Sequence, residues 1–230
     1  MPAFPLLQIN NLSVSFATEA GEVQALKNFS LEVNRGEIVA LVGESGSGKS
    51  VSSLSVLQLL PASARYTQGE ILFSPDGNKC ISLLNQSGRQ LAKLRGDEIA
   101  MIFQEPMTSL NPVLTCGRQV MEAIMRHRGA NRLQAMQQTT GLFSRVKLPD
   151  PTGMLKRYPH QLSGGQQQRV MIAMAMSCSP SLLIADEPTT ALDATVQKAI
   201  LGLLKELQQQ SDMGVIFITH DLGVVREIAD

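Results

Sequence analysis

A glycine-rich segment, Gly43-Glu-Ser-Gly-Ser-Gly-Lys-Ser50, constrains this chain more than any other part of its sequence. The segment matches the pattern G-x-x-x-x-G-K-[ST] in full. A buried-strand pattern precedes it at Ile38–Val42, and helical spacing follows it at Val51, Leu54 and Leu57. Glycines let successive main-chain N–H groups turn toward an anion, and the start of a helix adds a favourable dipole. A plain turn needs none of this context, so the sequence predicts a phosphate loop.

The residues of this loop have expected roles toward ATP and Mg²⁺, the two predicted ligands. Lys49 is expected to reach the β- and γ-phosphates, and the Ser50 hydroxyl to coordinate Mg²⁺. The rest of the loop and the first helical residue after it are expected to bind the nucleotide, which gives the set Gly43, Glu44, Ser45, Gly46, Ser47, Gly48, Lys49, Ser50 and Val51.

Four nearly continuous apolar runs predict strands buried on both faces of a mostly parallel sheet. They are Ile38–Val42, Ile99–Phe103, Leu182–Ala185 and Val215–Thr219. Polar or loop residues follow each run, in order Gly43, Gln104, the pair Asp186-Glu187, and His220. Because ligands bind at the carboxyl ends of strands in open α/β sheets, these residues are expected to share one catalytic edge.

The polar residues at this edge suggest a hydrolytic site. Asp186 is expected to hold Mg²⁺, and Glu187 to polarise the water that attacks the γ-phosphate. His220 is expected to sense the γ-phosphate through one ring nitrogen. Two exposed loop acids and a surface histidine are the plain alternatives, and the complete phosphate loop argues against them. His127 and His160 lack such a position and are interpreted as structural or surface residues.

The remaining patterns complete the predicted fold. Alternation at Leu12, Val14 and Phe16, and in Ile71–Phe73, predicts half-exposed antiparallel strands. Residues 112–160 have helical spacing and predict a helical subdomain inserted between the second and third core strands. The predicted fold class is an α/β P-loop NTPase core, RecA-like and mostly parallel, with an antiparallel β subdomain, in one domain over residues 1–230. Helical spacing after Asp221 without a stop signal suggests a C-terminal truncation.

Composition narrows the function classes. The chain has 20 basic and 20 acidic residues, and this zero net charge lowers the expectation of nucleic-acid binding. The three cysteines, Cys80, Cys116 and Cys178, are too far apart to suggest a zinc site or a disulfide framework. No apolar run is long enough for a membrane span and the N-terminus lacks a secretion signal, so a soluble protein is expected.

Leu162-Ser-Gly-Gly-Gln166 is a second glycine-rich segment, and it precedes a helical run at Gln167–Ser177. From the residues alone, a helix cap is the default interpretation and anion binding the alternative. The ordered set of motifs nevertheless resembles the ABC-transporter ATPases over essentially the whole chain: the phosphate loop, Gln104, Ser163–Gln166, Asp186-Glu187, Ala191-Leu-Asp193 and His220. A P-loop kinase would not carry the second glycine-rich segment.

In the ABC-transporter ATPases two ATPase domains pack head to tail, with each ATP between one phosphate loop and the partner's signature segment. The resemblance implies that Ser163, Gly164, Gly165 and Gln166 serve the opposing nucleotide, with Asp193 at the dimer interface. It also implies that Gln104 contacts Mg²⁺ or the attacking water and couples the site to membrane subunits. Phe16 stands where these proteins carry an adenine-stacking aromatic, although its alternation equally suits a core-facing strand residue.

Two longer segments, Phe103–Pro112 and Tyr158–Ser163, resemble the dipeptide, oligopeptide and nickel importer ATPases. This resemblance implies an ATP-hydrolysing subunit that energises a membrane importer for peptides or a related small solute. The implied partners are a second ATPase domain, two transmembrane permease subunits and, indirectly, a solute-binding protein, with no nucleic acid. The implied location is cytoplasmic, peripheral on the inner face of the cell membrane. The alternative is a soluble ABC-type ATPase that acts on nucleic acid or ribosomes.

Overall fold

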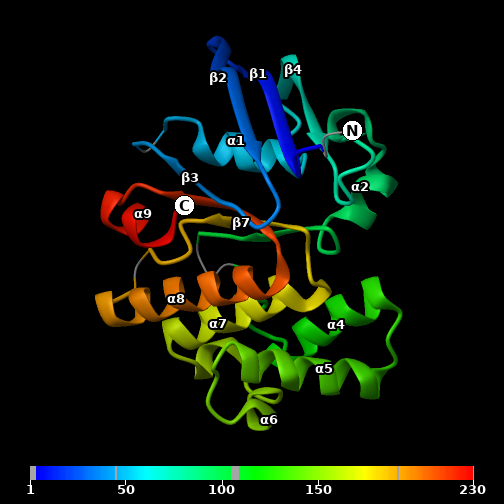
Figure 1. Ribbon diagram of the computed structural model, residues 1–230, viewed down its shortest axis with the longest axis vertical. Helices are drawn as coiled ribbons and strands as arrows, with labels where there is room; N and C mark the ends of the chain where they lie inside the picture. Colours follow the sequence, from blue (N-terminus) through cyan, green and yellow to red (C-terminus); the bar gives the residue numbers. More distant parts are fainter. Residues whose placement is uncertain (1–3, 45, 105–108, 191, 230) are drawn as a thin grey trace.

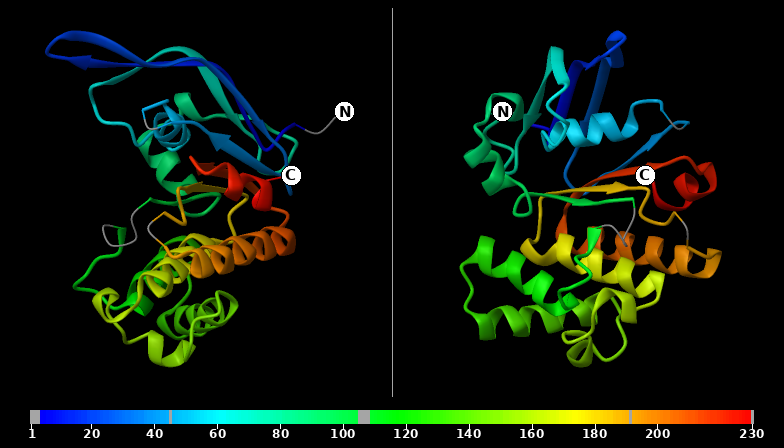
Figure 2. Two further views of the ribbon diagram at one scale, coloured as in Figure 1. Left: turned by 90° about the vertical axis from the view of Figure 1, so that its left-hand side faces the viewer. Right: turned by 180° about the vertical axis from the view of Figure 1, so that it is seen from behind.

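The computed structural model describes residues 4–44, 46–104, 109–190 and 192–229. In these residues an antiparallel sheet, a parallel sheet and a layer of helices are stacked on one another (Figure 1). The parallel sheet is the middle layer, as the views from the side and from behind also show (Figure 2). Ser45, Ala191 and residues 105–108, which belong to predicted motifs, lie outside the described residues.

The antiparallel sheet has the strand order β2-β1-β4-β5. Its strands are β1 (Leu7–Thr18), β2 (Gly21–Val33), β4 (Ala64–Phe73) and β5 (Ile81–Ser82). Leu12 and Val14 are fully buried in β1. The predicted half-exposed face is not seen at this point, because the intervening Ser13 and Ser15 are buried as well. The sequence analysis did not identify β2, an edge strand with mostly exposed side chains that give it little hydrophobic pattern.

One glycine of β4 is required by this sheet. The β1–β4 register shifts between Asn10 and Ser13, which brings β1 against Gly69. Gly69 has a φ of +91°, and a Cβ atom there would lie 2.5 Å from the Asn10 carbonyl oxygen. Only glycine accepts both the left-handed backbone and this close approach.

The parallel sheet has the strand order β3-β8-β7-β6. Its strands are β3 (Ile38–Val42), β6 (Ile99–Ile102), β7 (Leu182–Asp186) and β8 (Gly214–Thr219). Every residue of the two central strands, β7 and β8, is buried, as their continuous apolar runs predict. Phe103 was predicted as a strand residue but follows the end of β6 and is 41% exposed, since β6 is at the sheet edge.

The helices lie mainly on the face of the parallel sheet away from the antiparallel sheet (Figure 1). They are α1 (Lys49–Val56), α2 (Gly88–Leu94), α4 (Cys116–Arg128), α5 (Arg132–Arg145), α6 (Pro151–Met154), α7 (Gly164–Ala175), α8 (Ala194–Ser211) and α9 (Leu222–Ile228). There are also three short 3₁₀ turns: Leu83–Asn85 between β5 and α2, Pro159–Gln161 between α6 and α7, and Met176–Cys178 between α7 and β7. Helices α4, α5 and α6 come between β6 and β7 in the chain.

Two hydrophobic cores hold these layers together. One lies between the parallel sheet and the helices, and includes Phe143 and Phe217. The other lies between the two sheets, where α1 also packs, and includes Phe73. In the described part of the chain, no helix combines the length and the apolar character that a membrane crossing requires.

Candidate functional site

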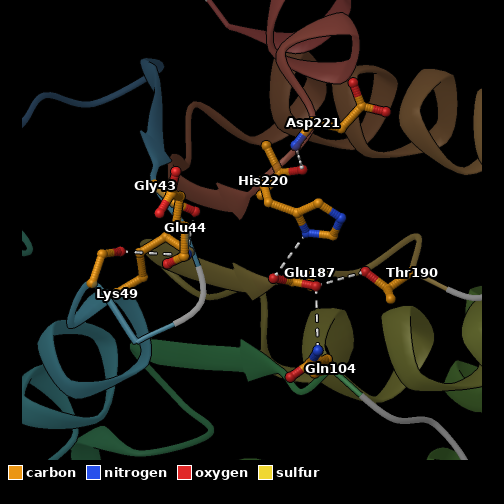
Figure 3. Close-up of polar contacts among 10 residues, drawn as sticks. Gly43, Glu44, Lys49, Gln104, Glu187, Thr190, His220 and Asp221 are labelled. Carbon is orange, nitrogen blue, oxygen red and sulfur yellow. Dashed lines mark hydrogen bonds and ion pairs between the residues drawn. The ribbon is translucent and has the colours of Figure 1, made fainter.

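The predicted phosphate loop joins β3 to α1, at the carboxyl end of a parallel strand. Gly46 and Gly48 have φ values of +83° and +91°, and a Cβ on Gly48 would lie 2.9 Å from the Ala25 carbonyl oxygen. These conformations explain why the loop requires glycine at both positions. The side chain of Lys49 folds back over the loop, as Figure 3 shows. Its Nζ donates to the carbonyl oxygens of Gly43 and Glu44, at 2.5 and 2.7 Å.

Ser50 and Asp186 lie together at the start of α1 and the end of β7, close enough for the Ser50 hydroxyl to affect the pKa of the Asp186 carboxyl. Burial raises the pKa of Asp186, while the Ser50 hydrogen bond and the Lys49 ammonium oppose this rise and the Glu187 charge adds to it. A hydroxyl and a buried carboxylate are the hard oxygen ligands that suit Mg²⁺. Two of the three residues predicted to contact the metal, Ser50 and Asp186, therefore fit it by chemistry and by proximity. The third, Gln104, donates its amide to Glu187.

Glu187 is the centre of a hydrogen-bonded cluster at the same sheet edge (Figure 3). The Gln104 amide donates to its Oε2 at 3.2 Å, and His220 Nδ1 lies 3.2 Å from its Oε1. The Thr190 hydroxyl donates to Oε2 at 2.9 Å. The structure thus brings together the three predicted catalytic residues that follow β6, β7 and β8.

The backbone of Glu187 is in an uncommon conformation for a residue with a side chain. Its φ is +46°, in the left-handed region. Two main-chain hydrogen bonds fix this conformation: Glu187 N donates to the Ile218 carbonyl at 3.0 Å, and Thr190 N donates to the Glu187 carbonyl at 3.2 Å. Such conformations cost about 1–3 kcal/mol and are concentrated at functional sites. The turn after β7 therefore directs the carboxylate toward Gln104 and His220 at a cost in stability.

Electrostatics keep Glu187 ionised. Burial alone would raise its pKa, but hydrogen bonds from Thr190 and His220 and the charges of His220 and Lys49 together lower the pKa below the ordinary value. The neighbouring Asp186 pKa is raised, chiefly by burial. The two adjacent carboxyl groups are thus shifted in opposite directions by their surroundings, a pattern typical of sites where the two acids have different roles.

A hollow of about 210 Å³ connects the loop to this cluster. Its lining residues come from β2, the phosphate loop, α1 and the ends of β6 and β7: Ala25, Gly46, Gly48, Lys49, Ser50, Val51, Gln104 and Glu187. A hollow of about 700 Å³ beside α4 is larger, but it contains none of the predicted site residues. The smaller hollow is the candidate nucleotide site, because there the predicted phosphate loop faces an ionised carboxylate.

The second glycine-rich segment lies elsewhere on the surface, at the start of α7. The Ser163 side chain caps this helix. In return, the main-chain N–H of Ser163 donates a hydrogen bond to the side-chain oxygen of Gln166. Gly165 has no space for a side chain, because a Cβ would lie 2.7 Å from Val196 on α8. Asp193 caps α8 by accepting a hydrogen bond from Val196 N at 2.9 Å. These residues and Gly164 lie next to one another, and none of them lines the hollow of about 210 Å³ at the phosphate loop.

Phe16 is half-buried on β1 and packs against the core between the two sheets. It pairs with Val23 on β2 and Ala64 on β4, and it does not line the hollow. Its stacking on adenine stays a prediction.

Sequence analysis missed two residues of the site. Thr190 is one of the hydrogen-bond partners of Glu187, and its hydroxyl three positions after the acid, in the turn Glu187-Pro-Thr-Thr190, was an available signal. Ala25 lines the hollow from β2, and no side-chain chemistry could have marked it.

Residues 26–190 match the family model described as ABC transporter. The chain belongs to the ABC transporter family. It is 53% identical over 226 residues to the glutathione import ATP-binding protein GsiA of Salmonella typhimurium, covering 98% of this chain and 36% of the relative. It is 51% identical over 231 residues to GsiA of Escherichia coli O1:K1 / APEC, covering 100% of this chain and 37% of the relative. The chain thus spans little more than a third of the length of these curated relatives.

Solved structures agree with this assignment. A dimeric ATP-binding cassette, MJ0796, in a post-hydrolysis state bound to ADP and Pi, has a TM-score of 0.82 and 32% identity over 96% of this chain and 90% of that one. The cbiO1 protein of Clostridium perfringens, part of the cbiONQ transporter complex, has a TM-score of 0.79 and 26% identity over 98% of this chain and 82% of that one.

These comparisons confirm the predicted family and α/β P-loop fold. The MJ0796 cassette is bound to ADP and Pi, and the GsiA relatives are named as ATP-binding proteins. ATP hydrolysis by this chain, with ATP and Mg²⁺ as its ligands, stays a prediction. The comparisons give no support to the nucleic-acid alternative. The roles of single residues remain predictions.

Proposed function

We propose that this domain hydrolyses ATP to energise a membrane importer of peptides or a peptide-like small solute. The observation that carries the proposal is the arrangement of Glu187, which lies with Gln104 and His220 across one hollow from Lys49. The identity of 53% to a protein named for glutathione import supports the solute class. Glutathione is itself a short peptide, so the relatives and the predicted peptide class agree.

The chemistry that we propose divides the work among residues on the two sides of the hollow. Lys49 exchanges its present main-chain acceptors for phosphate oxygens when ATP binds, because phosphate is the stronger, charged acceptor. Glu187 accepts a hydrogen bond from the attacking water and orients it toward the γ-phosphate. Gln104 and His220 fix the position of that carboxylate. Mg²⁺, held by Ser50 and Asp186, would neutralise charge on the phosphates.

A second ATPase domain completes the site in this proposal. The hollow of about 210 Å³ is small beside the roughly 300–1,000 Å³ of typical ligand pockets, so it accommodates part of a nucleotide. Ser163 and Gln166 lie at the N-terminus of the 12-residue helix α7, on the surface and outside the hollow. A head-to-tail partner would place its copy of this helix start over the phosphates. The partner is a second copy or a related chain.

The remaining partners follow from the importer class. We propose that two transmembrane permease subunits bind the domain on the cytoplasmic face of the membrane, that a solute-binding protein delivers cargo from the other side, and that nucleic acid is not a ligand.

Transport by the reconstituted complex tests this proposal. The full-length protein, its permeases and its solute-binding protein would be placed in proteoliposomes, and ATP-dependent uptake of glutathione, a dipeptide and nickel measured separately. We expect uptake of a peptide solute that Glu187→Gln abolishes and that Glu19→Gln, at the exposed β1–β2 turn, leaves unchanged. Uptake of nickel alone would contradict the solute class, and uptake that persists in Glu187→Gln would contradict the proposed role of ATP hydrolysis.

A further inference from the structure

The segment that leads into helix α7 is held from inside the protein by one glutamine. The side chain of Gln167, the fourth residue of α7, is only 6% exposed. Its amide nitrogen Nε2 donates to the carbonyl oxygens of Pro159 and Leu162, at 2.9 and 3.2 Å. Pro159 begins the 3₁₀ turn that precedes the second glycine-rich segment, and Leu162 follows the end of that turn. Gln167 thus reaches back along the chain and binds both ends of the turn.

The orientation of the Gln167 amide is fixed by its surroundings. Both atoms that it binds are carbonyl oxygens, which only accept hydrogen bonds, so the NH₂ group of the amide must face them. The amide oxygen Oε1 is buried and has no hydrogen-bond partner in the described parts of the chain. An unsatisfied buried acceptor costs free energy, and an apolar side chain of the same size would avoid that cost. The two donated hydrogen bonds are therefore what distinguishes a glutamine at this position.

One peptide unit is bound on both of its sides by neighbouring glutamines. The Leu162 carbonyl accepts from the Gln167 side chain at 3.2 Å. The N–H of Ser163, the other half of that peptide unit, donates to Oε1 of Gln166 at 3.1 Å. The backbone is extended at Leu162 and Ser163, before the helix begins, so side chains supply the partners that this peptide needs. Because a peptide unit is planar, fixing its oxygen and its N–H fixes the direction in which the chain enters α7.

The start of α7 is held by its neighbours as well. A Cβ at Gly165 would lie 2.7 Å from Val196, so the first turn of α7 packs closely against α8. Gln167 N donates to the Ser163 carbonyl at 2.9 Å, in addition to the side-chain hydrogen bond to Leu162. Packing against α8 and the hydrogen bonds of Gln167 therefore fix the Ser163 segment together.

We propose that Gln167 is a positioning residue, which orders the Leu162–Ser163 peptide before a second ATPase domain binds. Its buried side chain touches no nucleotide and acts through the peptide that it holds. This inference rests on the proposed head-to-tail arrangement, in which Ser163 and the N-terminus of α7 meet the opposite phosphates. A segment that is already ordered loses less conformational entropy on association. Without the Gln167 hydrogen bonds the segment would be ordered only on binding, and the dimer would be weaker.

Dimer formation with Mg·ATP tests this role. The full-length protein with Glu187→Gln would be the parent, and analytical ultracentrifugation would give its dimer dissociation constant. Adding Gln167→Met keeps the length of the side chain and removes both donors. We expect the dissociation constant to rise roughly tenfold, the usual effect of losing one or two neutral hydrogen bonds. The affinity of the monomer for ATP, measured at low protein concentration, should stay at the value of the parent, which a general loss of structure would not allow.

The matched control is Gln209→Met, the same substitution at an exposed position of α8, and it should change neither quantity. A double-mutant cycle with Ser163→Ala asks whether Gln167 acts through the peptide that it holds. If it does, the loss of dimerisation in the double variant should be smaller than the product of the two single losses. Independent losses in the cycle, or a parallel loss of ATP affinity in Gln167→Met, would overturn the proposal.

Urea unfolding checks that each variant folds, and Gln167→Leu, which also lacks the donors, serves if Gln167→Met does not fold. A Glu187→Gln parent that stays monomeric with Mg·ATP would contradict the head-to-tail arrangement, and this inference with it. A dimeric parent whose Gln167→Met variant dimerises equally well would overturn the role of Gln167 alone. The two failures are therefore distinguishable.

Discussion

The Thr190 hydroxyl donates a hydrogen bond of 2.9 Å to Oε2 of Glu187, the oxygen that also accepts from Gln104. Replacing Thr190 by valine keeps the shape of the side chain and removes this donor. Because the hydrogen bond favours the ionised form, its loss should raise the Glu187 pKa. The acid limb of the pH–activity profile should then move to higher pH, and Thr190→Ser should restore it. An unmoved acid limb in Thr190→Val would show that the hydroxyl does not tune the carboxylate.

The lowered pKa of Glu187 in the wild-type protein also affects the stability of the fold. A group whose pKa is lower in the folded protein stabilises the fold above its unfolded pKa, and this contribution is lost as pH falls through the folded pKa. Glu187 should therefore contribute to the free energy of unfolding at neutral pH and cease to do so in acid. The free energy of unfolding of Thr190→Val and of the wild-type protein would be measured in denaturant at several pH values. The difference between the two proteins should be smaller at acid pH than at neutral pH.

Glu187→Gln should keep ATP binding and slow turnover by roughly 10²–10⁴, the usual effect of losing a general base. In the proposed head-to-tail arrangement, this variant of the full-length protein should also dimerise with Mg·ATP in analytical ultracentrifugation. Glu19→Gln is the control, since Glu19 lies in the exposed β1–β2 turn. Wild-type turnover in Glu187→Gln would show that this residue has no part in the mechanism. A variant that stays monomeric with Mg·ATP would count against the head-to-tail dimer.

Lys49→Ala should weaken ATP binding, because the β- and γ-phosphates lose a charged hydrogen-bond donor. Hydrogen bonds to charged groups contribute about 1.5–3 kcal/mol, which corresponds to a Kd raised roughly tenfold to a hundredfold. Isothermal titration calorimetry measures the change, with Lys27→Ala on exposed β2 as the control. Equal affinities in the wild-type protein and Lys49→Ala would contradict the role given to this ammonium.

The cysteines should differ in their reaction with iodoacetamide. Burial raises the pKa of the Cys116 thiol to about 11, and its side chain is fully buried at the start of α4. Cys80 is exposed. Since the thiolate is the reacting form, mass spectrometry of the native protein should find Cys80 alkylated and Cys116 unmodified. Unfolding in denaturant should abolish the difference, and rapid labelling of native Cys116 would contradict the burial described.

Two glycine-to-alanine substitutions should change stability in opposite directions. At Gly69 the added Cβ meets the Asn10 carbonyl oxygen in a left-handed backbone, so destabilisation of about 1–3 kcal/mol is expected. At Gly141, inside α5, a Cβ has open space, and alanine should stabilise by about 0.5–1 kcal/mol. Urea unfolding measures both. Similar effects at the two sites would show that β4 tolerates a side chain at position 69, opposite the register shift in β1.

The sequence predicts the core sheet well because β7 and β8 are buried on both faces and their apolar runs are continuous. It also predicts which residues meet at the site, since parallel strands place the residues after β6, β7 and β8 at one edge. It does not predict β2, whose exposed side chains leave no periodic signal. Nor does it predict the bond between Thr190 and Glu187, which depends on the left-handed turn after β7.

The contact between Gly165 and Val196 has a consequence for how the domain transmits motion. A Cβ at position 165 would come within 2.7 Å of Val196, so the first turns of α7 and α8 are in direct van der Waals apposition. Val196 also donates the hydrogen bond that anchors Asp193 at the cap of α8. A shift of the Ser163–Gln166 segment toward α8 would therefore press on the start of that helix, which Asp193 caps. The two regions proposed to meet the opposite ATPase are thus in direct contact with each other.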